Sequence, residues 1–255
     1  MEYGICCNPQ TAQQAARTGF DYFEWTVGAF LKPREDAQAF QASLNEVRQS
    51  GLPCPAVNVF VPADLKITGP SVNQAALEEF VTTACLRASQ AGVDRIVFGS
   101  GGARRVPEGF DRREAWNQLL SFLHMLAPIA SRNGITIAVE PLNLAECNIL
   151  TSVAECARLV RQVNHPSIRL LVDAYHLLKD NDSLEDIVAN RDLLAHVHVA
   201  TVPNRLAPGM EDCGLPLFFE ALKLSGYTGR ISIEANLPDS PHDFVRAIQT
   251  MSVFF

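Results

Sequence analysis

Short apolar runs alternate with longer amphipathic stretches along the whole chain. The short runs have the length of β-strands, and the stretches between them repeat apolar residues at helical spacing. The predicted strands lie near residues 3–7, 21–26, 55–60, 94–98, 135–140, 168–173, 194–199 and 230–235. The predicted helices lie near residues 9–18, 35–50, 72–91, 111–133, 151–163, 183–190, 214–225 and 240–252.

Eight strand and helix pairs are the number that closes a barrel of parallel strands. The strands should follow one another through right-handed crossovers, which are the default for parallel strands. The length of 255 residues suits one such barrel, and no linker rich in Pro, Gly or Ser divides the chain. The sequence therefore predicts the α/β class, a single (β/α)8 TIM barrel, in one domain over residues 1–255.

Local signals mark several helix ends. Capping patterns predict that helices begin after Ser71, Asp111, Ser152 and Ser183, each of which precedes an acid or Gln three residues later. A crude repeat ends helices with glycine shortly before a strand, as a left-handed turn from helix to strand requires. These glycines are Gly19, Gly92, Gly134 and Gly226.

Composition narrows the range of partners. Apolar residues make up 47% of the chain, which is enough for a large core, and the formal net charge is −7. An acidic chain argues against a nucleic-acid surface, and no apolar run reaches the ~18 residues of a membrane helix. The seven cysteines form no Cys-x-x-Cys pair. We therefore expect reduced thiols in a cytoplasmic protein with no signal peptide.

Four residues able to bind a hard metal ion each close a predicted strand. They are Glu140, Asp173, His198 and Glu234. Side chains at the carboxyl ends of parallel strands converge on one mouth of a barrel. A carboxylate held near an apolar core is costly unless a cation neutralises it. Three carboxylates and one imidazole in this ring predict a site for one divalent cation.

Several motifs at these strand ends resemble one known family. The segments are Val139–Asn143, Asp173–His176, His196–Val199 with Asn204-Arg205 and Pro208-Gly209, and Ile233–Ala235. Together they resemble the xylose isomerase-like TIM-barrel superfamily. The likeness within it is to sugar isomerases and epimerases of the hydroxypyruvate isomerase and D-tagatose 3-epimerase kind. The order of elements matches over nearly the whole chain, and the specific motifs lie in its second half.

The resemblance implies a ligand set and a mechanism. Glu140, Asp173, His198 and Glu234 would hold one Mn²⁺ or Mg²⁺, with Co²⁺ and Zn²⁺ left open. The metal would act as a Lewis acid on a carbonyl and its neighbouring hydroxyl. Glu140 and Glu234 would be the catalytic pair, one removing the α-proton and the other returning a proton. Proton return at the adjacent carbon gives an isomerase, and return on the opposite face gives an epimerase.

The resemblance also implies substrate contacts. His176, three residues after Asp173, and Glu146 resemble the residues that bind substrate hydroxyls, and Arg205 resembles an arginine that holds a substrate oxygen. One position departs from the pattern, because Leu144 stands where the epimerases usually carry Arg. The expected partner is a small sugar or sugar acid, with no nucleic acid and no membrane, and a homo-oligomer is left open.

Further residues near the predicted mouth carry weaker signals. The glycine-rich stretch Gly99–Gly109 contains Arg104 and Arg105, which could hold a phosphate or carboxylate or could simply be solvated. Trp25, Asn58 and Phe60 either wall a sugar pocket or pack in the core.

His196 is expected to be a structural residue. It lies two positions before His198, and it is expected to point away from the mouth.

A barrel of this kind could serve three other functions. A metal-dependent dehydratase of the inosose or dehydroshikimate dehydratase kind would use the same first step, the enolisation of a carbonyl compound, and remains the alternative. A DNA-repair nuclease of the endonuclease IV kind would need extra histidines on early strands, where this chain has Asn58 and Gly99. A binding protein would not need four converging ligands. The favoured function is a metal-dependent sugar isomerase or epimerase.

Overall fold

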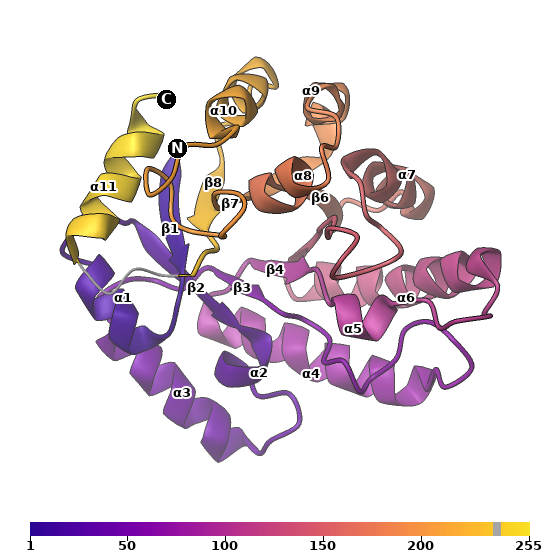
Figure 1. Cartoon of the computed structure of the whole chain (residues 1–255). Helices are drawn as coiled ribbons and strands as arrows, with labels where there is room; N and C mark the ends of the chain where they lie inside the picture. Colours follow the sequence, from indigo (N-terminus) through magenta and orange to yellow (C-terminus); the bar gives the residue numbers. More distant parts are fainter. Residues whose placement is uncertain (237–240) are drawn as a thin grey trace.

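Eight parallel strands close into one barrel in the computed structural model, which describes residues 1–236 and 241–255. Each strand pairs with its sequence neighbours, and β1 pairs with β8. The strands lie inside a ring of helices (Figure 1). They are β1 (Glu2–Cys6), β2 (Tyr22–Thr26), β3 (Ala56–Asn58), β4 (Arg95–Phe98), β5 (Thr136–Val139), β6 (Ile168–Asp173), β7 (Leu194–Val199) and β8 (Arg230–Ile233).

One helix of the outer ring lies between each pair of successive strands, and α11 follows β8. They are α1 (Pro9–Ala15), α3 (Ala37–Gln49), α4 (Gln74–Ala91), α6 (Arg112–Arg132), α7 (Val153–Val163), α9 (Glu185–Ala189), α10 (Leu215–Leu224) and α11 (Pro241–Ser252). A 3₁₀ turn, Arg191–Leu193, precedes β7. No helix in residues 1–236 and 241–255 has both the length and the apolar character needed to cross a membrane.

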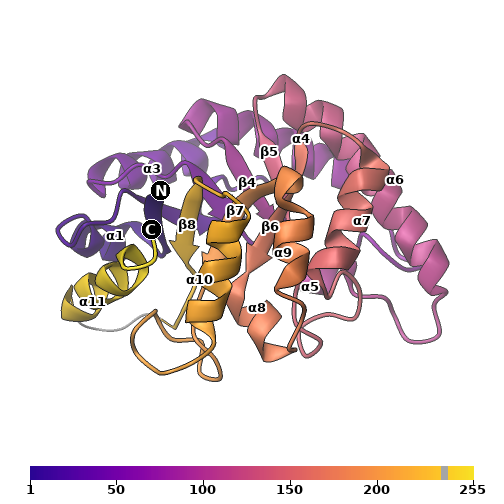
Figure 2. The same cartoon turned by 90° about the horizontal axis from the view of Figure 1, so that it is seen from above.

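Three short helices lie just after β2, β4 and β6 and were not predicted. They are α2 (Val27–Phe30), α5 (Gly101–Arg104) and α8 (Ala174–Lys179). The side view shows α5, α8 and the loop after β7 along the edge toward which the strands point (Figure 2). This edge is the mouth of the barrel.

The predicted single barrel is confirmed, and the helix starts are partly confirmed. Asp111 and Ser152 cap α6 and α7 by accepting hydrogen bonds from backbone N–H groups. The other two starts were wrong, since Asn73 caps α4 and the residue before α9 makes no side-chain cap. The four glycines of the repeat all have positive φ, between 71° and 102°. Position 240, the first of the last predicted helix, lies outside the described residues.

The barrel interior is divided between apolar and polar side chains. Val97, Ala138 and Leu171, from β4, β5 and β6, form a small buried apolar group of their own. The large core lies between the barrel and its helices. A buried polar group comes from β2, β7 and β8: Tyr22, Glu24, His196, His198 and Ser232.

The Gly99–Gly109 segment does not form an anion site around Arg104. The Arg104 side chain is fully buried and donates to the carbonyl oxygens of Phe98 (3.0 Å), Glu140 (2.8 Å) and Leu150 (3.2 Å). Its guanidinium therefore ties β4 to the segments after β5. Arg105 is exposed, and its guanidinium lies 3.4 Å from the carbonyl oxygen of Ala145. The two arginines have different roles, which their adjacency in sequence concealed.

Arg104→Met should lower the free energy of unfolding by about 3 to 5 kcal/mol, because three buried carbonyl groups lose a charged donor. Arg105→Met is the matched control and should change it by no more than about 0.5 kcal/mol. Urea denaturation of both variants measures the difference, provided that the unfolding free energy depends equally on urea concentration in the two. Equal stability of the two variants would show that the buried guanidinium contributes nothing to the fold.

Candidate metal centre and active site

The four predicted ligands meet at the mouth of the barrel. Glu140 and Glu234 follow β5 and β8 immediately, Asp173 is the last residue of β6, and His198 lies near the end of β7. The backbone N–H groups of Glu140 and Glu234 donate to carbonyls of the preceding neighbouring strands, which fixes both residues on the barrel rim. Glu140, Asp173 and His198 are buried, and the Glu234 side chain is 21% exposed. The site is thus open on the Glu234 side.

The distances are short enough for one small ion. Nδ1 of His198 lies 3.3 Å from Oε1 of Glu140 and 3.7 Å from Oε2 of Glu234. One ligand-type atom each from Glu140, Asp173, Glu234 and His176 also lies within 4.8 Å of the others. The structure therefore brings all four predicted ligands together and adds His176 as a rival for the imidazole position.

Hydrogen bonding argues against His176 as a ligand. Its Nδ1 accepts the backbone N–H of Asn143 at 3.2 Å, so Nδ1 carries no proton. The neutral ring must then hold its proton on Nε2, which faces Oδ2 of Asp173 at 3.6 Å. A protonated Nε2 has no lone pair for a metal. His176 is therefore placed as a donor at the edge of the site.

His198 has the opposite arrangement. Its Nε2 lies 3.1 Å from Oε1 of Glu24, a fully buried carboxylate, and donates to it. Its Nδ1 points at Glu140 and Glu234 without making a hydrogen bond of good geometry. Nδ1 is thus the free nitrogen that a metal would use, and Nε2 makes the carboxylate contact typical of metal-bound histidines.

Three buried atoms in the cluster lack a hydrogen-bond partner in the described part of the chain. They are Oε1 of Glu140, Oδ2 of Asp173 and Nδ1 of His198. A buried polar atom without a partner costs about 1–3 kcal/mol, so three in one place require an explanation. Two carboxylate oxygens and one imidazole nitrogen suit a divalent cation such as Mn²⁺ or Mg²⁺. These residues therefore fit the predicted ion.

The acidities of the two candidate catalytic glutamates differ. Burial raises the pKa of Glu140. Burial also acts to raise the pKa of Glu234, but His198 and Arg205 outweigh it and lower that pKa. Burial opposes a charge on His198, yet Glu24 and Glu234 raise its pKa well above the usual value. Because a metal binds only the neutral imidazole, His198 would coordinate through an Nδ1 that carries no proton.

Two of the three predicted substrate-binding residues, Arg205 and Glu146, lie on the open side of the cluster, whereas His176 is buried. Arg205 donates to Oε2 of Glu234, lies 3.5 Å from Glu146, and stacks 4.7 Å over the ring of Tyr175. Glu146 accepts a hydrogen bond from the Asn143 side chain at 2.8 Å. Arg205 and Glu146 are 25% and 39% exposed, so both can reach a bound molecule.

The loop after β5 differs from the epimerase pattern at one position, Leu144. Leu144, at the position of the usual Arg, is 66% exposed, and its backbone N–H donates to Asp180 at 2.6 Å. Asn143, which sequence analysis did not single out, contacts both His176 and Glu146 and so holds this loop against the site. The position after Asn143 supplies no charged side chain.

The early strands also contribute. The Asn58 side chain is buried at the end of β3, and its Nδ2 lies 3.4 Å from Oε1 of Glu234. Trp25 stacks on Phe30 at 5.9 Å, and Phe60 packs on Phe80 and Phe98. Of the three predicted wall residues, Asn58 therefore touches the candidate site, and Phe60 belongs to the core.

His196 does not point away from the barrel interior. Side chains two residues apart on a strand share a face, so His196 lies below His198, with ring centroids 5.1 Å apart. It is fully buried, and burial lowers its pKa to about 4 against the opposing charge of Glu24. The direction predicted for His196 was wrong. Its Nε2 donates to Glu24 at 2.9 Å.

A second group of ligand-type atoms lies deeper, from Cys6, Glu24 and His198. Burial raises the pKa of the Cys6 thiol well above its usual value, and the Glu24 charge adds to this. The thiol is therefore protonated, and the His198 nitrogen on this side is already bonded to Glu24. This group does not offer the free donors that a metal needs.

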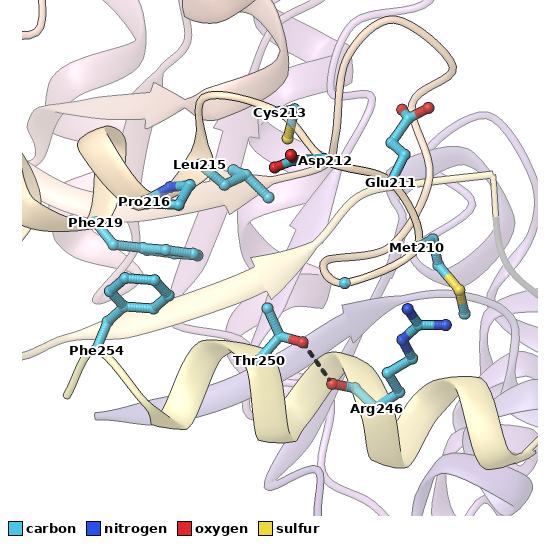
Figure 3. Close-up of a pocket in the computed structure, with 11 residues that line it drawn as sticks. Met210, Glu211, Asp212, Cys213, Leu215, Pro216, Phe219, Arg246, Thr250 and Phe254 are labelled. Atoms are coloured by element: carbon cyan, nitrogen blue, oxygen red, sulfur yellow. Dashed lines mark hydrogen bonds between the residues drawn. The ribbon is translucent and has the colours of Figure 1, made fainter.

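A separate pocket lies beside the mouth, between the loop after β7 and α11. Figure 3 shows Arg246 and Thr250 on α11 facing this loop, with Phe219 against Phe254 at one end. The cavity measures about 410 Å³. None of the candidate ligands or substrate-binding residues lines it. It is distinct from the candidate centre.

The barrel and its ring of acids at the strand ends define a class of TIM-barrel proteins with a candidate cation site. Residues 12–252 match the model of the xylose isomerase-like TIM barrel family. The chain belongs to this family, as its motifs predicted.

Curated relatives in this family act on sugars and sugar acids. The chain is 29% identical over 116 residues to the 3-dehydro-D-guloside 4-epimerase of Escherichia coli, covering 45% of this chain and 44% of that enzyme. It is 25% identical over 146 residues to the 2-oxo-tetronate isomerase of Cupriavidus necator, covering 56% and 55%. The matched segments thus span about half the length of these relatives.

A solved structure shows the same fold over the whole chain. The D-allulose 3-epimerase from Methylomonas sp. superposes with a TM-score of 0.84 at 23% identity, covering 100% of this chain and 98% of that one. This structure, at 23% identity, establishes the fold that the two chains share.

Gly99→Ala should disturb the centre specifically. A Cβ at Gly99 would lie 2.2 Å from Oε2 of Glu140, so the carboxylate must move away. Gly28→Ala is the matched control, because a Cβ there meets nothing within 4 Å. We expect Gly99→Ala to weaken Mn²⁺ binding at least about tenfold, as loss of one ligand's geometry does. Isothermal titration of both variants measures this, and equal affinities would contradict the placement of Glu140.

Proposed function

We propose that this protein is a divalent-metal-dependent isomerase or epimerase of a small ketose or keto sugar acid. The observation that carries the proposal is the set of three unpartnered buried atoms on Glu140, Asp173 and His198, which face one another beside an open, charged rim. The kinship with sugar epimerases and isomerases supports the same reaction class.

The chain's own groups would hold the ion in a defined way. Glu140, Asp173 and Glu234 would each give a carboxylate oxygen, and His198 would give Nδ1. Hard oxygen ligands with one imidazole favour Mn²⁺ or Mg²⁺, with Co²⁺ and Zn²⁺ as further candidates. When bound, the cation supplies Lewis-acid polarisation of the substrate carbonyl and its neighbouring hydroxyl.

The proton transfers would fall to Glu140 and Glu234. They stand on β5 and β8, on well-separated strands of the barrel, so they can flank a substrate. One carboxylate takes the α-proton, and the other acid returns a proton to the neighbouring carbon or to the opposite face. The opposite pKa shifts of the two residues favour such a division between base and acid.

The remaining residues would bind and orient the substrate. Arg205 offers guanidinium N–H groups to a substrate oxygen, and Glu146 accepts from a hydroxyl. His176 presents its Nε2 proton at the edge of the site because its Nδ1 is occupied by Asn143. The contact between Arg205 and Glu234 also fixes the carboxylate that would move a proton.

A divalent cation should stabilise the fold. Mn²⁺ at one hundred times its dissociation constant should add about 2.7 kcal/mol, and chelation should remove the gain. The Glu140→Gln/Asp173→Asn double variant should show no such gain, because it lacks two of the carboxylates. Thermal unfolding with and without Mn²⁺ tests this. An equal gain in the double variant would show that the cation binds elsewhere.

Each candidate base should be separately necessary. Glu140→Gln and Glu234→Gln should each lower kcat about 10²- to 10⁴-fold, the usual contribution of a positioned acid or base. Glu78→Gln, an exposed change on α4, is the control and should retain full activity. The assay follows deuterium uptake from solvent at the carbon beside the carbonyl, across C3 to C6 ketoses and hydroxypyruvate with Mn²⁺. Full activity in either site variant would end the two-base scheme.

The same assay separates isomerisation from dehydration. Deuterium uptake at that carbon without loss of water supports an isomerase or epimerase. A 2-keto-3-deoxy or enone product would instead indicate the dehydratase that the sequence left open.

A further inference from the structure

A glutamate that sequence analysis missed lies at the centre of the polar half of the barrel interior. Glu24 stands in the middle of β2, its side chain is fully buried, and no cationic Lys or Arg contacts it directly in the described residues. Its Oε1 accepts from Nε2 of His198 at 3.1 Å. Its Oε2 accepts from Nε2 of His196 and from Oγ of Ser232, both at 2.9 Å.

Every polar group that faces this carboxylate is a donor. The Ser232 hydroxyl gives its proton to Glu24, so the Tyr22 hydroxyl, 2.8 Å from Oγ of Ser232, must donate to Ser232 in turn. The result is a chain of donors that runs from Tyr22 through Ser232 to Glu24. An ionised carboxylate is the one side chain of this size that accepts on both oxygens and donates from neither.

This arrangement dictates the tautomer of His198. Because Nε2 donates to Glu24, the neutral ring leaves Nδ1 without a proton and aims it at Glu140 and Glu234. We propose that Glu24 is a positioning residue that holds His198 with Nδ1 free for the cation, acting from below the site without touching the ion or substrate. This inference rests on the metal centre proposed above and adds a fifth residue to it.

The arrangement around Glu24 requires a carboxylate, and an amide from Gln would not fit it. An amide has one accepting oxygen and one donating nitrogen, so its NH₂ would confront a donor among His196, His198 and Ser232. Relief would come by turning a ring or changing a tautomer. Turning the His198 ring would move Nδ1 away from the acids, and the other tautomer would place a proton on Nδ1. Either change removes the lone pair from the cluster, and the carboxylate contact that prevents it is worth about 10- to 100-fold in metal affinity.

The experiment is a double-mutant cycle read by Mn²⁺ affinity, measured by calorimetry or by electron paramagnetic resonance of the free ion. Glu24→Gln should weaken binding about 10- to 100-fold. In a His198→Gln background, the same change should weaken it less than about twofold, since Glu24 then has no ligand to position. A purely structural or long-range charge effect would persist in both backgrounds.

Two further variants keep the result interpretable. Tyr22→Phe removes a buried hydrogen bond of the same network without contacting Glu24 or His198, so it should leave Mn²⁺ affinity within about threefold while lowering stability. If Glu24→Gln does not fold, Glu24→Asp takes its place. This variant keeps the charge on a shorter side chain, and it should lose less Mn²⁺ affinity than is expected for Glu24→Gln.

The outcomes separate this inference from the proposed function. Unchanged affinity in Glu24→Gln, or equal losses in both backgrounds, overturns the positioning role while leaving the metal centre intact. A wild-type protein that binds no Mn²⁺ overturns both. A protein that binds Mn²⁺ through Glu24-dependent His198 but exchanges no sugar proton overturns the proposed reaction alone.

Discussion

Charge compensation at the end of an apolar barrel is the constraint on which this structure depends. Four carboxylates, from Glu24, Glu140, Asp173 and Glu234, lie at or below the mouth, and three of them are almost wholly buried. Such groups are tolerated only with donors or cations close by. Arg205 satisfies Glu234, and three donors satisfy Glu24, whereas one buried oxygen each of Glu140 and Asp173 has no hydrogen-bond partner in residues 1–236 and 241–255. The carboxylate oxygens that lack a partner lie in one cluster, and a cation would fit there.

The barrel meets this constraint by dividing its interior. Beneath β4 to β6 the interior is filled by the small apolar group of Val97, Ala138 and Leu171, which offers nothing to a charge. Beneath β2, β7 and β8 it is filled by the hydrogen-bonded group around Glu24. This apolar group therefore supplies no hydrogen-bond donor to the candidate ligands Glu140 and Asp173. On the polar side, Glu24 supports His198 from below, so the two halves contribute to the centre in different ways.

Sequence periodicity was sufficient to predict the barrel and to place the four candidate ligands at strand ends, because strand ends in a parallel barrel must converge. It failed where contacts depend on distant partners. Arg104 and Arg105 are neighbours in one loop, yet only the fold shows that Arg104 reaches three carbonyl groups inside. Glu24 carried a signal that was overlooked, a lone acid inside the apolar run Tyr22–Thr26. The error at His196 was one of geometry, since residues two apart on a strand share a face.

Proximity and hydrogen bonding favour different imidazoles as the candidate ligand of the centre. His176 has an atom in the tight cluster with the three acids, and His198 does not appear in that set. The hydrogen bonds reverse the choice, because the Asn143 backbone occupies Nδ1 of His176, whereas Glu24 occupies Nε2 of His198. The nitrogen left over on His198 points at the acids with a free lone pair, and the one left over on His176 carries a proton. By their hydrogen bonds the two histidines thus differ, one as the candidate ligand and the other as a donor, and the residues that set this difference lie on β2 and after β5.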